Sequence, residues 1–142
     1  MRMDRDISEY VGDTEMRLTE KVDESFWFGE RVGFGPVIWP KYSCSDIKSM
    51  RLLRLLPGEI IAPMQQDPSQ MIGHNIILGH SIEGWTCGYA RWVGGGVFDQ
   101  TKQSWFGDVT HPDMRKAIAL CAKKLIEAGV SFDGEENDDL PF

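Results

Sequence analysis

The last ten residues of the chain, 133–142, limit where a folded domain can end. They read Asp-Gly-Glu-Glu-Asn-Asp-Asp-Leu-Pro-Phe and show no hydrophobic periodicity. A segment this acidic buries too little apolar surface to offset the entropy lost on ordering, so we expect a flexible tail. The sequence therefore predicts one folded domain over residues 1–132 and a disordered acidic tail over residues 133–142.

Charge is divided unequally between the domain and the tail. The whole chain has a net charge of −7, and the tail holds five acidic residues and no basic ones. The domain is left with 17 acidic and 15 basic residues, which is a net charge of −2. A domain this close to neutral lacks the strong basic field that marks many nucleic-acid-binding proteins.

The tip of the tail combines a large apolar ring and a carboxylate on one residue, Phe142. A pocket can bury the ring while a basic side chain holds the terminal carboxylate. Pro141 lowers the entropy cost of ordering the tip, and Leu140 can fill a neighbouring hollow. Asp138 and Asp139 would steer the tip towards a basic surface. We therefore predict that these five residues bind a partner protein; the alternative is an acidic tail that only promotes solubility.

The acidic run that closes on Asp-Asp-Leu-Pro-Phe resembles the C-terminal tip of bacterial single-stranded-DNA-binding proteins, which ends in Asp-Asp-Ile-Pro-Phe. Leu140 stands where that family usually has Ile, and the resemblance covers about the last ten residues. In that family the tip docks on replication, recombination and repair enzymes. The resemblance therefore implies that host proteins which recognise this tip are the partners.

Patterning along residues 1–132 predicts an α+β fold, with a small antiparallel or mixed sheet covered by helices. Strands are expected where apolar and aromatic runs are bounded by glycine or proline, and helices where apolar residues recur every three or four positions. The expected strands are 25–28, 36–39, 59–62, 71–78, 85–93 and 103–106, and the expected helices are 14–22, 47–56 and 111–128.

The two longer helices carry boundary signals. Ser43 or Ser45 can cap the first of them, and Pro57 ends it. Thr110 is the expected cap of the last helix, and Gly129 is expected to end it. In the first of the two helices, the buried face is predicted to hold Ile47, Met50, Leu53 and Leu56, widened by Leu52 and Leu55, while Arg51 and Arg54 point away.

The strand-to-helix junction at residues 39–47 resembles a family of phage-encoded α-β-α sandwich domains, which often has a Pro-x-Tyr-Ser-Thr-Asp-Ile run there. The similarity spans about residues 36–129, although Cys44-Ser45 departs from the order of that run. It implies an α-β-α sandwich and a phage origin, and it transfers no catalytic residues. The residues that carry it are Trp39-Pro40-Lys41-Tyr42-Ser43-Cys44-Ser45-Asp46-Ile47, Gly84-Trp85, Tyr89, Trp92 and Ala117-Ile118-Ala119-Leu120-Cys121.

Aromatic residues gather between residues 85 and 106, with basic residues among them. On a sheet face such rings can stack unpaired bases, at about 1–3 kcal/mol for each base. The alternative, which is favoured in a chain this small, is that the rings form the core between sheet and helices. The residues that would contact single-stranded DNA are Trp85, Tyr89, Arg91, Trp92, Lys102 and Trp105.

No arrangement of residues indicates catalysis, a metal site or a cofactor. The histidines at 74, 80 and 111 have no cysteine or carboxylate at the spacing of a zinc site. Gly94-Gly95-Gly96 is followed by no Gly-Lys-Ser or Gly-Lys-Thr, so it is not a phosphate-binding loop. We therefore expect a non-enzymatic protein with no catalytic residues, no metal and no cofactor.

The cysteines and the start of the chain indicate the compartment. Three cysteines without a repeated spacing do not form a disulfide framework. Residues 1–6 are polar, unlike a signal peptide, and no apolar run approaches membrane-spanning length. We expect buried thiols in a cytoplasmic protein.

Three functions fit the sequence. The first is a phage-type accessory protein of DNA replication, recombination or repair, which uses its tail to dock on host proteins. The second is a single-stranded-DNA-binding protein with the aromatic sheet as its platform. The third is an inhibitor of a host defence or nuclease complex, in which acidic charge imitates DNA. The near-neutral domain favours the first over the second, and the charge behind the third lies mostly in the tail.

Overall fold

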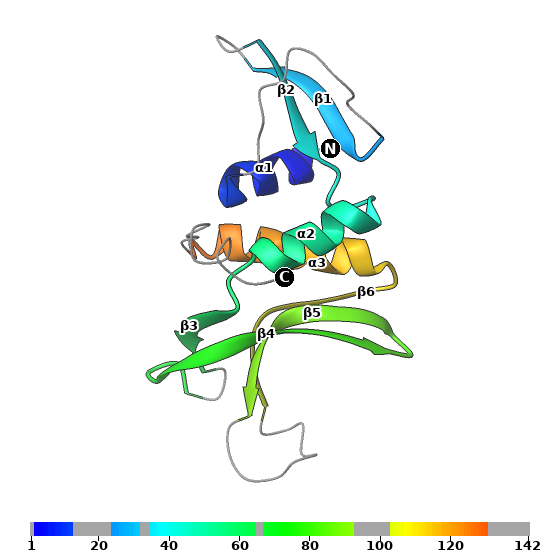
Figure 1. The fold of residues 1–142 in the computed structure, drawn as a ribbon. Coiled ribbons are helices and arrows are strands. Elements are labelled where there is room, and N and C mark those ends of the chain that lie inside the picture. The colour runs from blue at the N-terminus through cyan, green and yellow to red at the C-terminus, as the bar shows by residue number, and fades with distance from the viewer. Residues whose placement is uncertain (1, 13–23, 32–34, 65–66, 93–102, 131–142) are drawn as a thin grey trace.

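The structure, a computed structural model, describes residues 2–12, 24–31, 35–64, 67–92 and 103–130. Within these ranges, helices and antiparallel sheets are combined, which confirms an α+β fold (Figure 1). The helices are α1 (Arg2–Val11), α2 (Asp46–Leu55) and α3 (Met114–Glu127). The strands are β1 (Phe26–Arg31), β2 (Gly35–Pro40), β3 (Glu59–Pro63), β4 (Met71–Ser81), β5 (Gly84–Trp92) and β6 (Gln103–His111).

The strands form two separate sheets. β1 and β2 pair as a hairpin, and β3, β4, β5 and β6 pair in that order. Each strand of the larger sheet is antiparallel to the one that follows it in the chain. All six expected strands are present, and β6 continues five residues beyond the predicted end at 106.

The helices lie between the two sheets (Figure 1). α2 and α3 cover one face of the larger sheet, and α1 lies between α3 and the β1–β2 hairpin (Figure 1). In the part of the chain that the structure describes, helices lie against one face only of the larger sheet. An α-β-α sandwich needs a layer on each face, so that arrangement stays a prediction.

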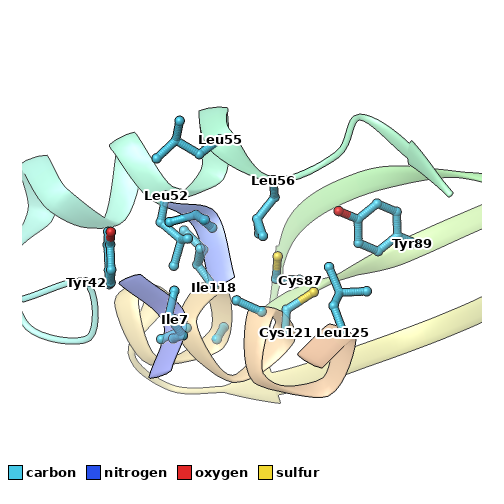
Figure 2. Packing of buried hydrophobic residues seen from close by; sticks show 14 of the residues in the cluster. Ile7, Tyr42, Leu52, Leu55, Leu56, Cys87, Tyr89, Ile118, Cys121 and Leu125 are labelled. Carbon is cyan, nitrogen blue, oxygen red and sulfur yellow. The ribbon is translucent and has the colours of Figure 1, made fainter. Parts of the chain in front are cut away.

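The hydrophobic core is built around α3 (Figure 2). Ile118, Cys121 and Leu125 of this helix are fully buried. They meet side chains of the other two helices and of the sheet, among them Ile7 of α1 and Leu52 of α2 (Figure 2). Because α3 touches α1, α2, β5 and β6, it is the element that joins the helical layer to the sheet.

A bulge in β6 sets which of its side chains reach this core. Cys87 of β5 pairs with Val109 and Tyr89 pairs with Phe106, so two residues of β6 oppose the single residue Gly88. Gly107 has a φ of 65°, a left-handed conformation that glycine adopts without strain. The extra residue puts Phe106 and Val109 on the same face, where both pack against the core.

Gly88 is required at this bulge because the strands come close together. A Cβ atom at Gly88 would lie 2.7 Å from the Cα of Asp108. Neither backbone can give way there without breaking the ladder between β5 and β6. A plain alternating pattern does not show such a bulge, and it would have assigned Phe106 and Val109 to opposite faces.

The sequence pattern predicts no helix before residue 14, yet residues 2–11 form α1. Its pattern is obscured because a carboxylate, Asp4, is fully buried together with Ile7 and Val11. The helix predicted over 14–22 lies outside the described residues.

The predicted cap of the last helix was wrong. Thr110 belongs to β6, where its Oγ1 lies 2.8 Å from Oγ1 of Thr86. Asp113 caps α3 instead, and its Oδ1 accepts the backbone N–H of Arg115 at 2.9 Å. For α2 the cap is Ser45, one of the two residues predicted. The error at Thr110 arises because β6 is longer than its apolar run.

Candidate functional site

The predicted partner-binding residues, 138–142, lie outside the described residues, so their role stays a prediction. Two properties of the domain bear on function. One is whether the aromatic residues form a platform for nucleic acid. The other is whether another surface carries chemistry that the sequence reasoning missed.

Two of the predicted DNA-contacting residues belong to the core. Tyr89 is fully buried, and its hydroxyl donates a hydrogen bond of 2.6 Å to the carbonyl oxygen of Pro57. Burial, together with nearby cysteine side chains, raises the pKa of the Tyr89 hydroxyl above its ordinary range. Trp85 is half-buried, packs against the core, and has its ring centroid 4.5 Å from that of His80. Tyr89 therefore offers no surface for a base in this structure, and Trp85 offers only part of one.

The other described members of the set lie elsewhere. Arg91 is exposed on β5, and Trp105 is half-buried on β6. Trp105 pairs with Ala90, whereas Phe106 pairs with Tyr89, so Trp105 lies on the face opposite to the helices. Lys102 and the side chain of Trp92 lie outside what the structure describes. The described residues of the set are therefore divided between the two faces of the sheet.

A buried carboxylate that sequence reasoning missed organises the junction before α2. Asp4 is fully buried. Its Oδ2 accepts hydrogen bonds from Nε1 of Trp27 at 2.7 Å and from Oγ of Ser43 at 2.9 Å, and its Oδ1 accepts the backbone N–H of Ser43 at 3.1 Å. Three donors satisfy the buried carboxylate. This network ties α1 and β1 to the start of α2, which points to a structural role for the junction.

The outward surface of α2 differs from the prediction. Ile47 and Met50 were expected to be buried, but 76% and 43% of their surface is exposed. The helix instead buries Ser49, Leu52 and Leu55. Ile47 and Met50 lie on the same side as the exposed Arg51 and Arg54, since these residues are three, four and seven positions from the first. We call these four residues the α2 outer stripe.

A shallow hollow and further basic side chains adjoin this stripe. The hollow has a volume of about 580 Å³, and Asp46 and Lys48 line it together with the four residues of the stripe. Nζ of Lys48 lies 4.1 Å from the centre of the Phe26 ring of the hairpin. The stripe therefore belongs to a surface that combines exposed apolar side chains with positive charge.

The buried cysteines are poor candidates for chemistry. Cys87 and Cys121 are both buried, as predicted, whereas Cys44 is exposed. The neighbouring thiol of Cys87 and burial together raise the pKa of Cys121, which leaves its thiol protonated at neutral pH. Within the described ranges, no three His, Cys, Asp or Glu side chains are grouped so that they could hold a metal ion.

The chain matches no protein-family model, no curated protein and no solved structure. None of the helices in the described part of the chain is long and apolar enough to cross a membrane.

Proposed function

We propose that this chain is a non-enzymatic, phage-type accessory protein of DNA metabolism that acts in the bacterial cytoplasm. It docks on host replication, recombination or repair proteins through Asp138, Asp139, Leu140, Pro141 and Phe142. The observation that carries the proposal is the order of these residues, since an acidic run that ends on an apolar tip and a free carboxylate matches a known docking peptide.

The properties of the domain support a docking function. Tyr89 lies in the core, and the thiols of Cys87 and Cys121 are buried and unsuited to nucleophilic chemistry. The domain is near neutral, whereas the tail holds five of the 22 acidic residues in about one fourteenth of the length. The most distinctive chemistry of the chain is therefore at its C-terminal end.

Docking has a simple physical form. The ring of Phe142 enters an apolar pocket of the partner, and a basic side chain of the partner holds the terminal carboxylate. Asp138 and Asp139 raise the association rate with a basic surface, and salt weakens that contribution. A short segment must be ordered on docking, so we expect an affinity on the order of micromolar for the isolated tail.

The test is capture of host proteins by the intact chain and by two variants. Phe142→Ala removes the only aromatic ring of the tail, and we expect it to lose the captured proteins. Leu140→Ile, which restores the residue usual in the single-stranded-DNA-binding family, is the matched control and should keep them. A peptide copying that family's tip should elute the same proteins. Recovery of the same proteins by Phe142→Ala would contradict the proposal.

Binding of single-stranded DNA is the second candidate, and one observation favours it. Trp105 is half-buried on the face of the sheet that the helices leave uncovered, and Arg91 is exposed on the neighbouring strand β5, on the other face. If they bind DNA, Trp105→Ala should weaken binding to fluorescent oligo-dT at low and moderate salt while the fold survives. Equal binding by the wild type and by Trp105→Ala would show that Trp105 is not part of a DNA-binding surface.

We also propose that the fold is an α-β-α sandwich, with a second layer on the face of the larger sheet that the helices leave uncovered. Ile61 and Met71 are exposed large apolar side chains on β3 and β4, and they lie side by side in neighbouring registers on the face away from the helices. A second layer, as in the α-β-α sandwich implied by the phage family, would bury them. Hydrogen exchange at Ile61 and its neighbours in the full chain would test for such a layer.

A further inference from the structure

The face of the larger sheet that the helices leave uncovered carries exposed, large apolar side chains. Ile61 of β3 and Met71 of β4 are 63% and 60% exposed, and Ile77 of β4 is 37% exposed. Ile61 pairs with Gly73 and Met71 pairs with Pro63, so Ile61 and Met71 are diagonal neighbours on one face. Ile77 is six positions beyond Met71 on the same strand, so it shares that face. We call this surface of β3–β6 the open face.

The open face is almost uncharged. Arg91 is the only lysine or arginine in the strands β3–β6, and it alternates with Tyr89 on the side that faces the helices. The carboxylates of these four strands are Glu59 and Asp108, which lie on the two edge strands. Single-stranded DNA and the acidic tail of the chain are therefore poorly matched to the open face, whereas an apolar, uncharged surface is well matched.

We infer that the open face packs on the open face of a second copy of the chain. The two surfaces then have the same apolar, nearly uncharged character, and no further partner is needed. Two-fold dimers are the commonest soluble oligomers, and their interface brings together the same patch of both molecules. The inference goes beyond the proposed sandwich, because there the second layer belongs to the same chain and here another molecule supplies it.

The open face is large enough for a specific interface. Its four strands lie about 4.8 Å apart, and β5 and β6 hold nine residues each at about 3.4 Å per residue, so the face measures roughly 19 by 30 Å. Two such faces bury about 1,000 Å² in total, which is near the lower limit for a specific interface between proteins. An interface of this size gives a dimer that dissociates on dilution, with a dissociation constant on the order of micromolar or weaker.

The arrangement of the described elements leaves room for a second copy. The helices and the β1–β2 hairpin lie on the opposite side of the larger sheet (Figure 1). The dimer therefore has its layers in the order helices, sheet, sheet, helices, and the two sheets stack about 10 Å apart. α3 lies on the outer side of each copy, away from the interface (Figure 1). On the proposed docking function, on which this consequence alone rests, a dimer presents two tips and gains avidity for a partner with two pockets.

Sedimentation equilibrium of the full-length chain tests the inference over concentrations from about 1 to about 200 μM. The wild type should pass from monomer to dimer in this range. Ile61→Lys and Met71→Lys each put a charge into the interface, and each should raise the midpoint concentration at least about tenfold. Lysine is well tolerated on an exposed edge strand such as β3. Ile47→Lys is the matched control, since Ile47 is exposed on α2, on the helix side of the sheet, and should keep the wild-type midpoint.

A measurement on the wild type alone does not depend on how the variants fold. In the full-length chain, the methyl resonances of Ile61 and Ile77 should shift as the protein concentration rises, and those of Ile47 should stay in place. Concentration-independent resonances of Ile61 and Ile77 would overturn the inference.

Three sedimentation outcomes would also overturn the inference. One is a wild type that stays monomeric throughout the range, and another is a dimer that both folded lysine variants keep. The third is a monomer in which the amides around Ile61 are strongly protected from hydrogen exchange, which would assign the second layer to the chain itself. Phe142→Ala should keep the dimer while it loses the captured host proteins, so failure of the dimer and failure of the proposed docking are distinguishable.

Discussion

The helices α2 and α3 have similar apolar periodicity and very different surroundings. α3 buries six residues along its length and touches α1, α2, β5 and β6. α2 buries three and leaves Ile47 and Met50 exposed beside Arg51 and Arg54. Periodicity therefore identifies a helix, but how much of its surface is covered depends on where the helix lies in the fold. The side of α2 that the sequence pattern assigned to the core therefore includes two exposed apolar residues, Ile47 and Met50.

The largest effects should come from side chains inside the core. Ile118→Ala in α3 and Leu52→Ala in α2 each remove a fully buried side chain, and each should lower the free energy of unfolding by about 2–5 kcal/mol. Ile47→Ala is the matched change on the outer side of α2 and should alter it by less than about 0.5 kcal/mol. Urea denaturation measures all three. An equal loss for Ile47→Ala and Leu52→Ala would mean that the outer side of α2 is covered.

Removing the N-caps of α2 and α3 should lower the free energy of unfolding by smaller amounts, which differ between the two helices. Asp113 accepts the N–H of Arg115 at 2.9 Å, whereas Oγ of Ser45 accepts the N–H of Lys48 at 3.4 Å. Asp113→Ala should lower the free energy of unfolding by about 1 kcal/mol, a typical value for the loss of a cap, and Ser45→Ala should cost less. A larger loss for Ser45→Ala in the same urea experiment would reverse this ranking.

The smallest effect concerns pH at the α3 cap. Hydrogen bonds and charge from Arg115 lower the pKa of the Asp113 carboxyl below its ordinary value. Because the folded pKa is the lower one, this stabilisation is complete above the ordinary pKa of about 3.9 and is lost as pH falls through the folded value. Asp113→Asn should therefore show a shallower loss of stability than the wild type below about pH 4. Parallel curves for the two proteins would show that the carboxylate contributes nothing.

The sequence predicted the elements whose patterns were regular. The leucine-rich stretch that becomes α2, the apolar face of α3 and the aromatic and β-branched strands all follow simple periods. It missed α1 because Asp4 is charged and yet buried, satisfied by donors that come from Trp27 and Ser43 far along the chain. Long-range partners of this kind leave no local signal.

The surfaces were harder to predict than the elements. Leucines at 52, 53, 55 and 56 make α2 apolar on several sides, so its periodicity alone did not decide between Leu52 and Met50 as the buried residue. The bulge at Gly107 also changes which residues of β6 share a face. Of the predicted aromatic contacts, Tyr89 lies in the core as the alternative interpretation expected, and the role of the tip remains a prediction.

One measurement tests the central claim, which is that Phe142 anchors the chain to proteins that recognise the single-stranded-DNA-binding tip. A labelled peptide copying that tip is bound to a purified host protein, and its displacement is followed by fluorescence anisotropy. The intact chain should displace it at concentrations on the order of micromolar, and Phe142→Ala should fail to do so at tenfold higher concentration. Equal displacement of the peptide by the intact chain and by Phe142→Ala would contradict the claim. The claim would also be contradicted if neither the intact chain nor Leu140→Ile displaced the peptide.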